Sequence, residues 1–80
     1  MIHSFDWSKP THLVRSPRAA QFGDGYRQVS GPTIARGTAE EMVDELRSMS
    51  RADARDVYLC QEGNNPMTLT EVEAQVARAQ

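Results

Sequence analysis

The chain has 80 residues, a net charge of −2 at neutral pH and one cysteine, which limits it to one small domain with a thin core and no internal disulfide. The lone cysteine favours a reducing, intracellular setting. No apolar run approaches the roughly 20 residues that a membrane span needs, and residues 1–4 lack a signal-peptide pattern, so we expect a cytoplasmic protein without membrane contact. So thin a core also makes a homodimer an expectation.

Charge is distributed unevenly along the chain. Residues 1–36 carry five cations and two acids, whereas residues 37–80 carry nine acids and four arginines. The five cations are scattered and form no Lys/Arg cluster, so the sequence does not predict direct binding of nucleic acid. The acidic half is more concentrated and favours contact with a basic surface on another protein.

Residues 1–20 are predicted to form an extended arm. Pro10 and Pro17 disfavour helix at the residue before each of them, and residues 11–14 have weak strand character. The sequence therefore predicts no helix in this part of the chain.

Residues 21–36 are predicted to form a β-hairpin. Asp24-Gly25 is a tight-turn signal, because glycine adopts a positive φ without steric cost. Residues 26–30 alternate large and polar side chains as a half-buried strand does, and Gly31-Pro32 ends that run. We expect residues 33–36 to return as its partner strand.

Residues 38–80 are predicted to form a helix, a strand and a second helix. Thr38 and Glu41 fit a capping box. An apolar stripe follows over residues 39–49, formed by Met42, Val43, Leu46 and Met49. Residues 50–55 are polar and short, and they fit either one further helical turn or a connector.

The strand and the second helix follow residue 55. Residues 56–61 are almost continuously apolar, which is typical of a central strand covered on both faces. Residues 62–66 contain a glycine, two asparagines and a proline and predict a loop. Capping boxes starting at Thr68 and at Thr70 both predict a helix from about residue 70 to the end. Residues 1–80 are thus expected to form one α+β domain.

Near the start of the chain, Phe5 and Trp7 are followed by two prolines and then by the run Phe22-Gly23-Asp24-Gly25-Tyr26. This order resembles the opening of the phage minor tail protein M family over residues 4–28. The resemblance implies phage or prophage ancestry and, for a complete member, assembly of the tail tip. Beyond Gln28 the sequence departs from the family pattern, because two predicted helices stand where a β-rich remainder is expected.

The sequence carries no catalytic or metal-binding constellation. His3 and His12 lack a neighbouring cysteine or a carboxylate pair at metal-ligand spacing. The run Gly23–Gly25 lacks the third glycine and the following helix of a dinucleotide loop. Cys60 lies in an apolar stretch, which favours a buried thiol over a reactive one. We therefore expect a protein that is not an enzyme and needs no cofactor.

Two groups of residues are candidates for binding a partner. Four carboxylates crowd into six residues of the first predicted helix, and several aromatic residues lie near predicted loops, where they can anchor an interface. The candidates are Glu40, Glu41, Asp44 and Glu45, together with Trp7, Phe22 and Tyr26. The same patterns also describe a solvated helix face and aromatic residues that fill the core, and both alternatives stay open.

The small size, the acidic helix and the missing chemistry resemble the profile of phage-encoded stoichiometric inhibitors, of which anti-CRISPR proteins are the best-known group. This resemblance implies a protein that blocks a bacterial host protein or effector complex in the host cytoplasm. The alternative expectation is a tail-tip or virion assembly protein, in which the arm and the hairpin dock onto neighbouring subunits.

Overall fold

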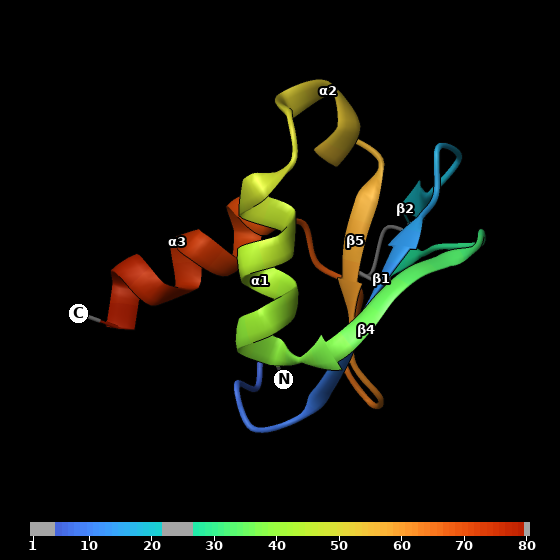
Figure 1. Cartoon of the computed structure of the whole chain (residues 1–80). Coiled ribbons are helices and arrows are strands. Elements are labelled where there is room, and N and C mark those ends of the chain that lie inside the picture. The colour runs from blue at the N-terminus through green and yellow to red at the C-terminus, as the bar shows by residue number, and fades with distance from the viewer. Residues whose placement is uncertain (1–4, 22–26, 80) are drawn as a thin grey trace.

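A three-stranded antiparallel sheet forms the centre of the fold (Figure 1). The computed structural model describes residues 5–21 and 27–79. The sheet has the order β4–β1–β5, made of Thr33–Thr38, Pro10–Arg15 and Val57–Cys60. Together with its helices this sheet makes an α+β fold, as the sequence predicted.

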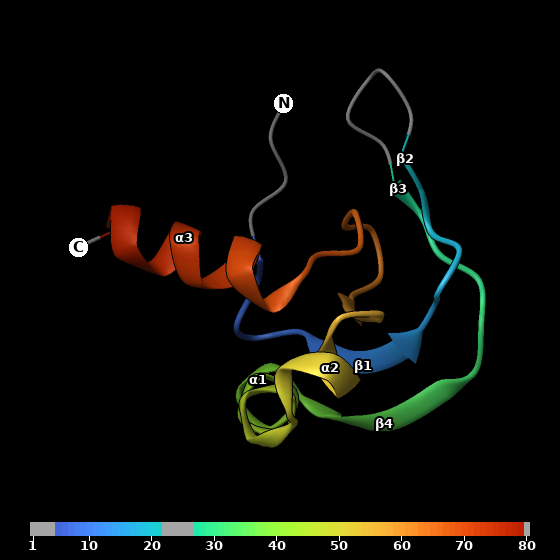
Figure 2. The ribbon, with the colours of Figure 1, turned by 90° about the horizontal axis from the view of Figure 1, so that it is seen from above.

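Helices and a short hairpin cover the two sides of the sheet. Helices α1 (Ala39–Ser48) and α3 (Leu69–Ala79) lie on one side, and a one-turn helix, α2 (Arg51–Ala54), connects α1 to β5. Strands β2 (Ala20–Gln21) and β3 (Arg27–Gln28) pair as a hairpin on the other side (Figure 2). We call the side that faces away from α1 and α3 the helix-free face.

Strand β1 is the central strand of the sheet. It pairs with β4 on one side and with β5 on the other, and Leu13, which faces Ala35 and Leu59, is fully buried. Of the extended arm predicted for residues 1–20, residues 10–15 are extended, but they form a strand of the sheet and not an arm, and residues 6–9 form a turn. The local sequence signal was weak because the partners of β1 lie about 20 and 45 residues further along the chain.

The predicted hairpin is partly wrong. Its two arms do pair across the Asp-Gly signal, with Ala20 opposite Gln28, while the turn itself lies outside the described residues. Residues 33–36, however, pair with β1 and not with residues 26–30. Gly31-Pro32 leads the chain from β3 to the side of β1 on which β4 pairs, instead of folding residues 33–36 back onto residues 26–30. The Arg15 N–H donates to the Pro32 carbonyl at 3.1 Å.

Strand β5 lies at the edge of the sheet, which corrects the prediction of a central strand. Its outer side is nevertheless covered, because the chain folds back after residue 61 and Met67 exchanges two backbone hydrogen bonds with Leu59, of 2.7 and 3.0 Å. Gly63 has a φ of +81° in this return loop, a conformation that glycine adopts without strain. This pairing satisfies backbone groups at the edge of β5, and the burial of Val57, Leu59 and Cys60 shows that both faces of the strand are covered.

Both long helices begin at capping boxes, as their sequences predict. The Thr38 hydroxyl accepts from the Glu41 N–H at 3.1 Å, and the Glu41 carboxylate accepts from the Thr38 N–H at 2.9 Å. Thr68 and Glu71 form the same pair of hydrogen bonds before α3, so the first of the two candidate boxes is the one used. Helix α1 ends at Ser48, one residue before the end of the apolar stripe that predicted it.

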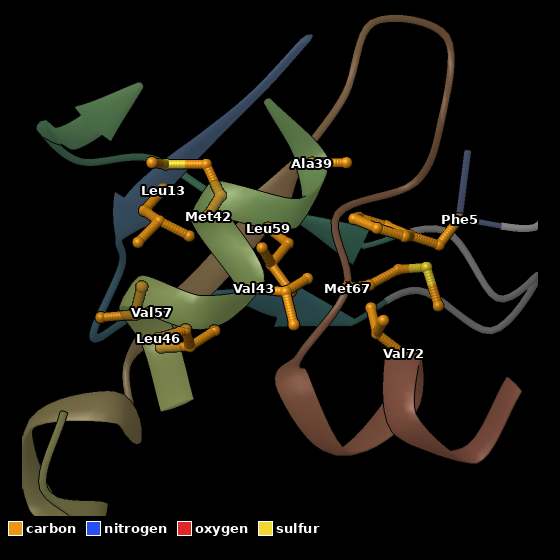
Figure 3. Packing of buried hydrophobic residues seen from close by; sticks show 10 residues of the cluster. All are labelled: Phe5, Leu13, Ala39, Met42, Val43, Leu46, Val57, Leu59, Met67 and Val72. Carbon is orange, nitrogen blue, oxygen red and sulfur yellow. The ribbon is translucent and has the colours of Figure 1, made fainter. Parts of the chain in front are cut away.

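The hydrophobic core lies between the sheet and the two long helices (Figure 3). Phe5 lies at one end of this cluster and Leu46 and Val57 lie at the other. The methionines of the core adapt to irregular gaps because their side chains are unbranched. The buried cluster consists of Phe5, Leu13, Ala39, Met42, Val43, Leu46, Val57, Leu59, Met67 and Val72.

An ion pair links the hairpin to α3. The Arg27 guanidinium donates to both carboxylate oxygens of Glu71, at 2.6 and 3.1 Å, and lies 5.3 Å from the centre of the Tyr58 ring. The hydrogen bond from Arg27 is the main reason that the pKa of Glu71 lies below its usual value. The pair therefore fastens the short hairpin to the rest of the domain.

We predict that Glu71→Gln makes stability less dependent on acid pH. A folded-state pKa below the unfolded value contributes stability that is present above the unfolded pKa and is lost as pH falls through the folded one. Glutamine retains the capping box, so the loss of unfolding free energy near pH 7 reports the ion pair alone. We expect this loss to be about 1 kcal/mol or less, because Glu71 is 44% exposed. Urea unfolding between pH 2 and 7 measures this, with Glu62→Gln as control. A loss of equal size at both ends of the range contradicts it.

We also predict that Gly31→Ala strongly destabilises the fold. A Cβ atom at Gly31 runs into the backbone carbonyl of Arg15, so the backbone itself has to move, and we expect a loss of about 2–3 kcal/mol. Gly37→Ala is the comparison variant, because its Cβ meets the ends of the Glu41 and Met42 side chains, at 2.8 and 3.2 Å, and not the backbone. These side chains can rotate away at the cost of the hydrogen bond from the Thr38 N–H to Glu41, so we expect a smaller loss of stability than for Gly31→Ala. Thermal unfolding compares the two. Equal losses of Tm would show that Gly31 is not specifically required.

Candidate functional site

A turn at residues 6–9 presents Trp7 to solvent. The Lys9 N–H donates to the Asp6 carbonyl at 3.2 Å, and the Asp6 carboxylate accepts from the Ser8 hydroxyl at 2.6 Å and from the Ser8 N–H at 2.9 Å. These two Ser8 donors hold the pKa of Asp6 below its usual value. Trp7 lies within this turn with 45% of its surface exposed. We call residues 6–9 the Trp7 turn.

The side-chain amide of Gln61 fixes the Trp7 turn to the end of β5. Its oxygen accepts from the Asp6 N–H at 3.0 Å, and its nitrogen donates to the Asp6 carbonyl at 2.6 Å and to the Thr11 hydroxyl at 2.9 Å. Asn64 donates to the same amide oxygen at 2.9 Å. Gln61 is itself buried, so these hydrogen bonds act where water cannot readily replace them.

Phe5 supports the Trp7 ring from the side of the core. The two ring centres lie 5.0 Å apart with the ring planes at 83°, an edge-to-face contact. Phe5 is buried, and its N–H donates to the Gln75 side chain of α3 at 2.9 Å. Trp7 is therefore an exposed aromatic residue held on a rigid support.

An open groove of ≈790 Å³ extends from Trp7 across the end of the sheet to the start of α1. Its walls are mostly apolar. His12 and Arg36, which are direct cross-strand partners on β1 and β4, belong to its lining. Glu41 and Glu62 also line the groove. We call this hollow the Trp7 groove.

The four acidic candidates all lie exposed on α1. Helical spacing places them on the face opposite the buried residues of α1, and we call this face the acidic face. The residues of the acidic face are Glu40, Glu41, Asp44 and Glu45.

Two of the four carboxylates are engaged within the domain. Glu41 accepts from the Thr38 backbone, and this hydrogen bond lowers the pKa of Glu41. Asp44 lies 3.7 Å from Arg47, which also pairs with Glu73 of α3 at 3.2 Å. Over the described part of the chain, no hydrogen bond or ion pair engages the side chains of the other two acids of this face.

The structure brings some predicted candidates together and leaves others undecided. Trp7 and Glu41 line the same groove, so the exposed aromatic residue and the acidic face form one continuous region. Phe22 and Tyr26 lie outside the described residues, and their role stays a prediction.

Sequence reasoning did not find Arg36 and Gln61, and it assigned His12 no role. Period-two alternation could have placed His12 and Arg36 on outward strand faces. Only the pairing of β1 with β4 makes them neighbours, however, and no local pattern in the sequence predicts that pairing. Gln61 was included in the predicted strand without a role of its own.

Cys60 is a buried free thiol, as the sequence predicted. Burial raises the pKa of this thiol to about 11. At neutral pH the reactive thiolate is therefore scarce, and Cys60 is poorly suited to nucleophilic chemistry.

Two further properties concern metals and membranes. Among residues 5–21 and 27–79, no group of three or more His, Cys, Asp or Glu side chains is arranged to hold a metal ion. Within the same ranges, no helix combines the length and the apolar character required to cross a bilayer.

No protein-family model, curated protein or solved structure matches this chain. The Trp7 groove and the acidic face are therefore the basis for a functional proposal.

We predict that Gln61→Met destabilises the domain and loosens the Trp7 turn. Methionine fills a similar volume but leaves the Asp6 N–H without an acceptor and removes one of the two hydrogen bonds at the Asp6 carbonyl and at the Thr11 hydroxyl, and an unsatisfied buried polar group costs about 1–3 kcal/mol. Because Trp7 is the only tryptophan of the chain, its fluorescence anisotropy reports the turn and should fall at native conditions. Gln28→Met, at an exposed site on β3, is the control and should change stability by less than about 0.5 kcal/mol. Unchanged anisotropy would show that Gln61 does not hold the Trp7 turn in place.

Proposed function

We propose that this chain is a non-enzymatic, phage- or prophage-encoded protein that binds and blocks a bacterial host protein complex, as anti-CRISPR inhibitors do. The observation that carries the proposal is the junction of the acidic face with the exposed, rigidly supported Trp7. The site of action is the cytoplasm of the bacterial host, and the protein acts by occupying a surface of its target.

The acidic face supplies attraction to a basic surface. Glu40 and Glu45 are exposed and, within the residues that the structure describes, their side chains are engaged by no hydrogen bond or ion pair. Charges of one sign on one face accelerate the encounter with a surface of opposite sign, and this acceleration weakens as salt is added. Effector complexes that hold nucleic acid have basic grooves of this kind.

Trp7 supplies the anchor of the contact. Tryptophan is among the residues that most often dominate binding energy at protein interfaces. Asp6 and Ser8 order the turn, and Phe5 orients the ring before any partner arrives. Little side-chain entropy is then lost on binding, and more of the contact energy appears as affinity.

The size of the domain is sufficient for this task. Its accessible surface is 5541 Å², and a standard interface covers about 800 Å² on each partner. One side of the molecule, bounded by Trp7 and α1, can therefore provide a complete interface. A blocking protein of this kind acts at a ratio of one inhibitor to one target site.

A tail-tip or virion assembly role is the second candidate. The observation that favours it is the position of the segment that resembles the minor tail protein M family. Strand β1 and the β2–β3 hairpin belong to that segment, and the hairpin extends on the side opposite α1 and α3 (Figure 2). In this alternative, the hairpin contacts neighbouring virion subunits.

We predict that the protein captures one host complex from a bacterial lysate at a stoichiometric ratio and inhibits it. The lysate should come from cells that carry a CRISPR system but no phage, and the captured complex is identified by mass spectrometry and then titrated. The double variant Glu40→Gln/Glu45→Gln should bind about tenfold more weakly, mainly through a slower association rate at low salt. Trp7→Ala should weaken binding by about 2 kcal/mol or more.

The matched control is Ala52→Lys/Gln28→Lys, which changes the net charge by the same amount at exposed sites away from α1. Its affinity should stay within about twofold of the unmodified protein. Equal weakening by both double variants would show that net charge matters and the acidic face does not. Co-purification with mature virions, without any host complex, would support the tail alternative and overturn the inhibitor proposal.

A further inference from the structure

Two cationic or hydrogen-bonding side chains stand side by side on the helix-free face without partners. His12 on β1 and Arg36 on β4 are paired in register, and the neighbouring Leu13 and Ala35 face the core side. Alternation along a strand therefore places both side chains on the opposite face. In the part of the chain that the structure describes, neither side chain takes part in a hydrogen bond or an ion pair.

The surroundings of this pair are mostly apolar. The Trp7 turn forms one wall of the ≈790 Å³ groove, and Pro10 lies beside it. Lys9 also lines the groove and adds a positive charge to it, and its Nζ donates to the Glu62 carbonyl at 3.1 Å. Within the described residues, His12 and Arg36 are side chains of this groove that have no hydrogen-bond or ion-pair partner, and they lie in a groove that also offers an indole surface.

We infer that the Trp7 groove binds an acidic peptide segment of the partner protein. One carboxylate of that segment is bound by Arg36 and His12, and an adjacent apolar side chain packs against Trp7. Guanidinium groups form strong, directional hydrogen bonds with carboxylates. The inference rests on the proposed function, since the host target supplies the segment, and it adds the chemistry that the groove selects.

The acids of the groove decide between a peptide and a nucleic acid. Glu41 and Glu62 both line the hollow, so an anion finds favourable charge near Arg36 and His12 and unfavourable charge beyond them. A nucleic-acid strand carries a phosphate at every nucleotide and would bring several charges against these carboxylates. A peptide carries one isolated carboxylate between neutral residues, which fits this pattern.

The Trp7 groove and the acidic face then bind regions of opposite charge on one partner. The acidic face selects a basic surface, while the adjoining groove selects an acidic segment. Two neighbouring contacts of opposite sign fix the orientation of the partner, because the reversed arrangement places like charges together. Such a pair of contacts explains how a small domain can choose one target among many basic surfaces.

The fluorescence of Trp7 tests the inference directly, without the host target. The probes are three blocked pentapeptides, Gly-Phe-Asp-Phe-Gly and its Asn and Lys counterparts, titrated into the full chain. We expect the Asp peptide to shift the Trp7 emission to shorter wavelength and to bind about tenfold more tightly than the Asn peptide. The Lys peptide should bind most weakly. Arg36→Gln should abolish the preference for Asp over Asn.

Arg51→Gln on α2 is the matched control, since it removes an equal charge at an exposed site outside the groove, and it should leave the preference intact. Equal affinities for the Asp and Asn peptides would overturn the inference. Tighter binding of an oligothymidylate than of the Asp peptide, lost in Arg36→Gln, would replace it with a nucleic-acid site. Failure of these titrations leaves the capture of a host complex unaffected, so the two proposals can fail separately.

Discussion

The pairing of β1 with two strands at once is the constraint on which the rest of the structure depends. It buries Leu13 between Ala35 and Leu59 and creates the surface on which α1 and α3 pack. The same pairing sets His12 beside Arg36 on the opposite face. Side chains alternate along a strand, so a shift of the strand register by one residue would bring polar side chains into the core. The same shift would separate His12 from Arg36.

A second level of organisation depends on polar contacts that span the chain. Gln61 joins the end of β5 to the Trp7 turn, and Arg27 joins the hairpin to Glu71 of α3. These contacts connect residues that are 55 and 44 positions apart. In a domain whose core is thin, they position segments that hydrophobic burial alone leaves unspecified. The buried amide contributes more than the ion pair, because water competes less with its hydrogen bonds.

The proposed function combines features that have separate structural origins. The acidic face follows from helical spacing, since residues that alternate with a buried stripe must face solvent. The exposed indole depends on a turn with its own hydrogen bonds, and the groove depends on strand pairing. Their meeting at the start of α1 gives a small surface one aromatic anchor and charges of both signs. Specific recognition of a protein partner requires this combination more than it requires a large area.

The sequence by itself determined the features that arise within a few residues. Both capping boxes, the buried stripe of α1, the burial of Cys60 and the strand at β5 all follow from short-range patterns, because their causes lie in local spacing. Tertiary structure alone decided that β1 is central, that β4 pairs with it, and that Arg36, His12 and Trp7 share one groove. The physical reason is that strand pairing joins distant residues through backbone hydrogen bonds, which leave little trace in the identity of the side chains.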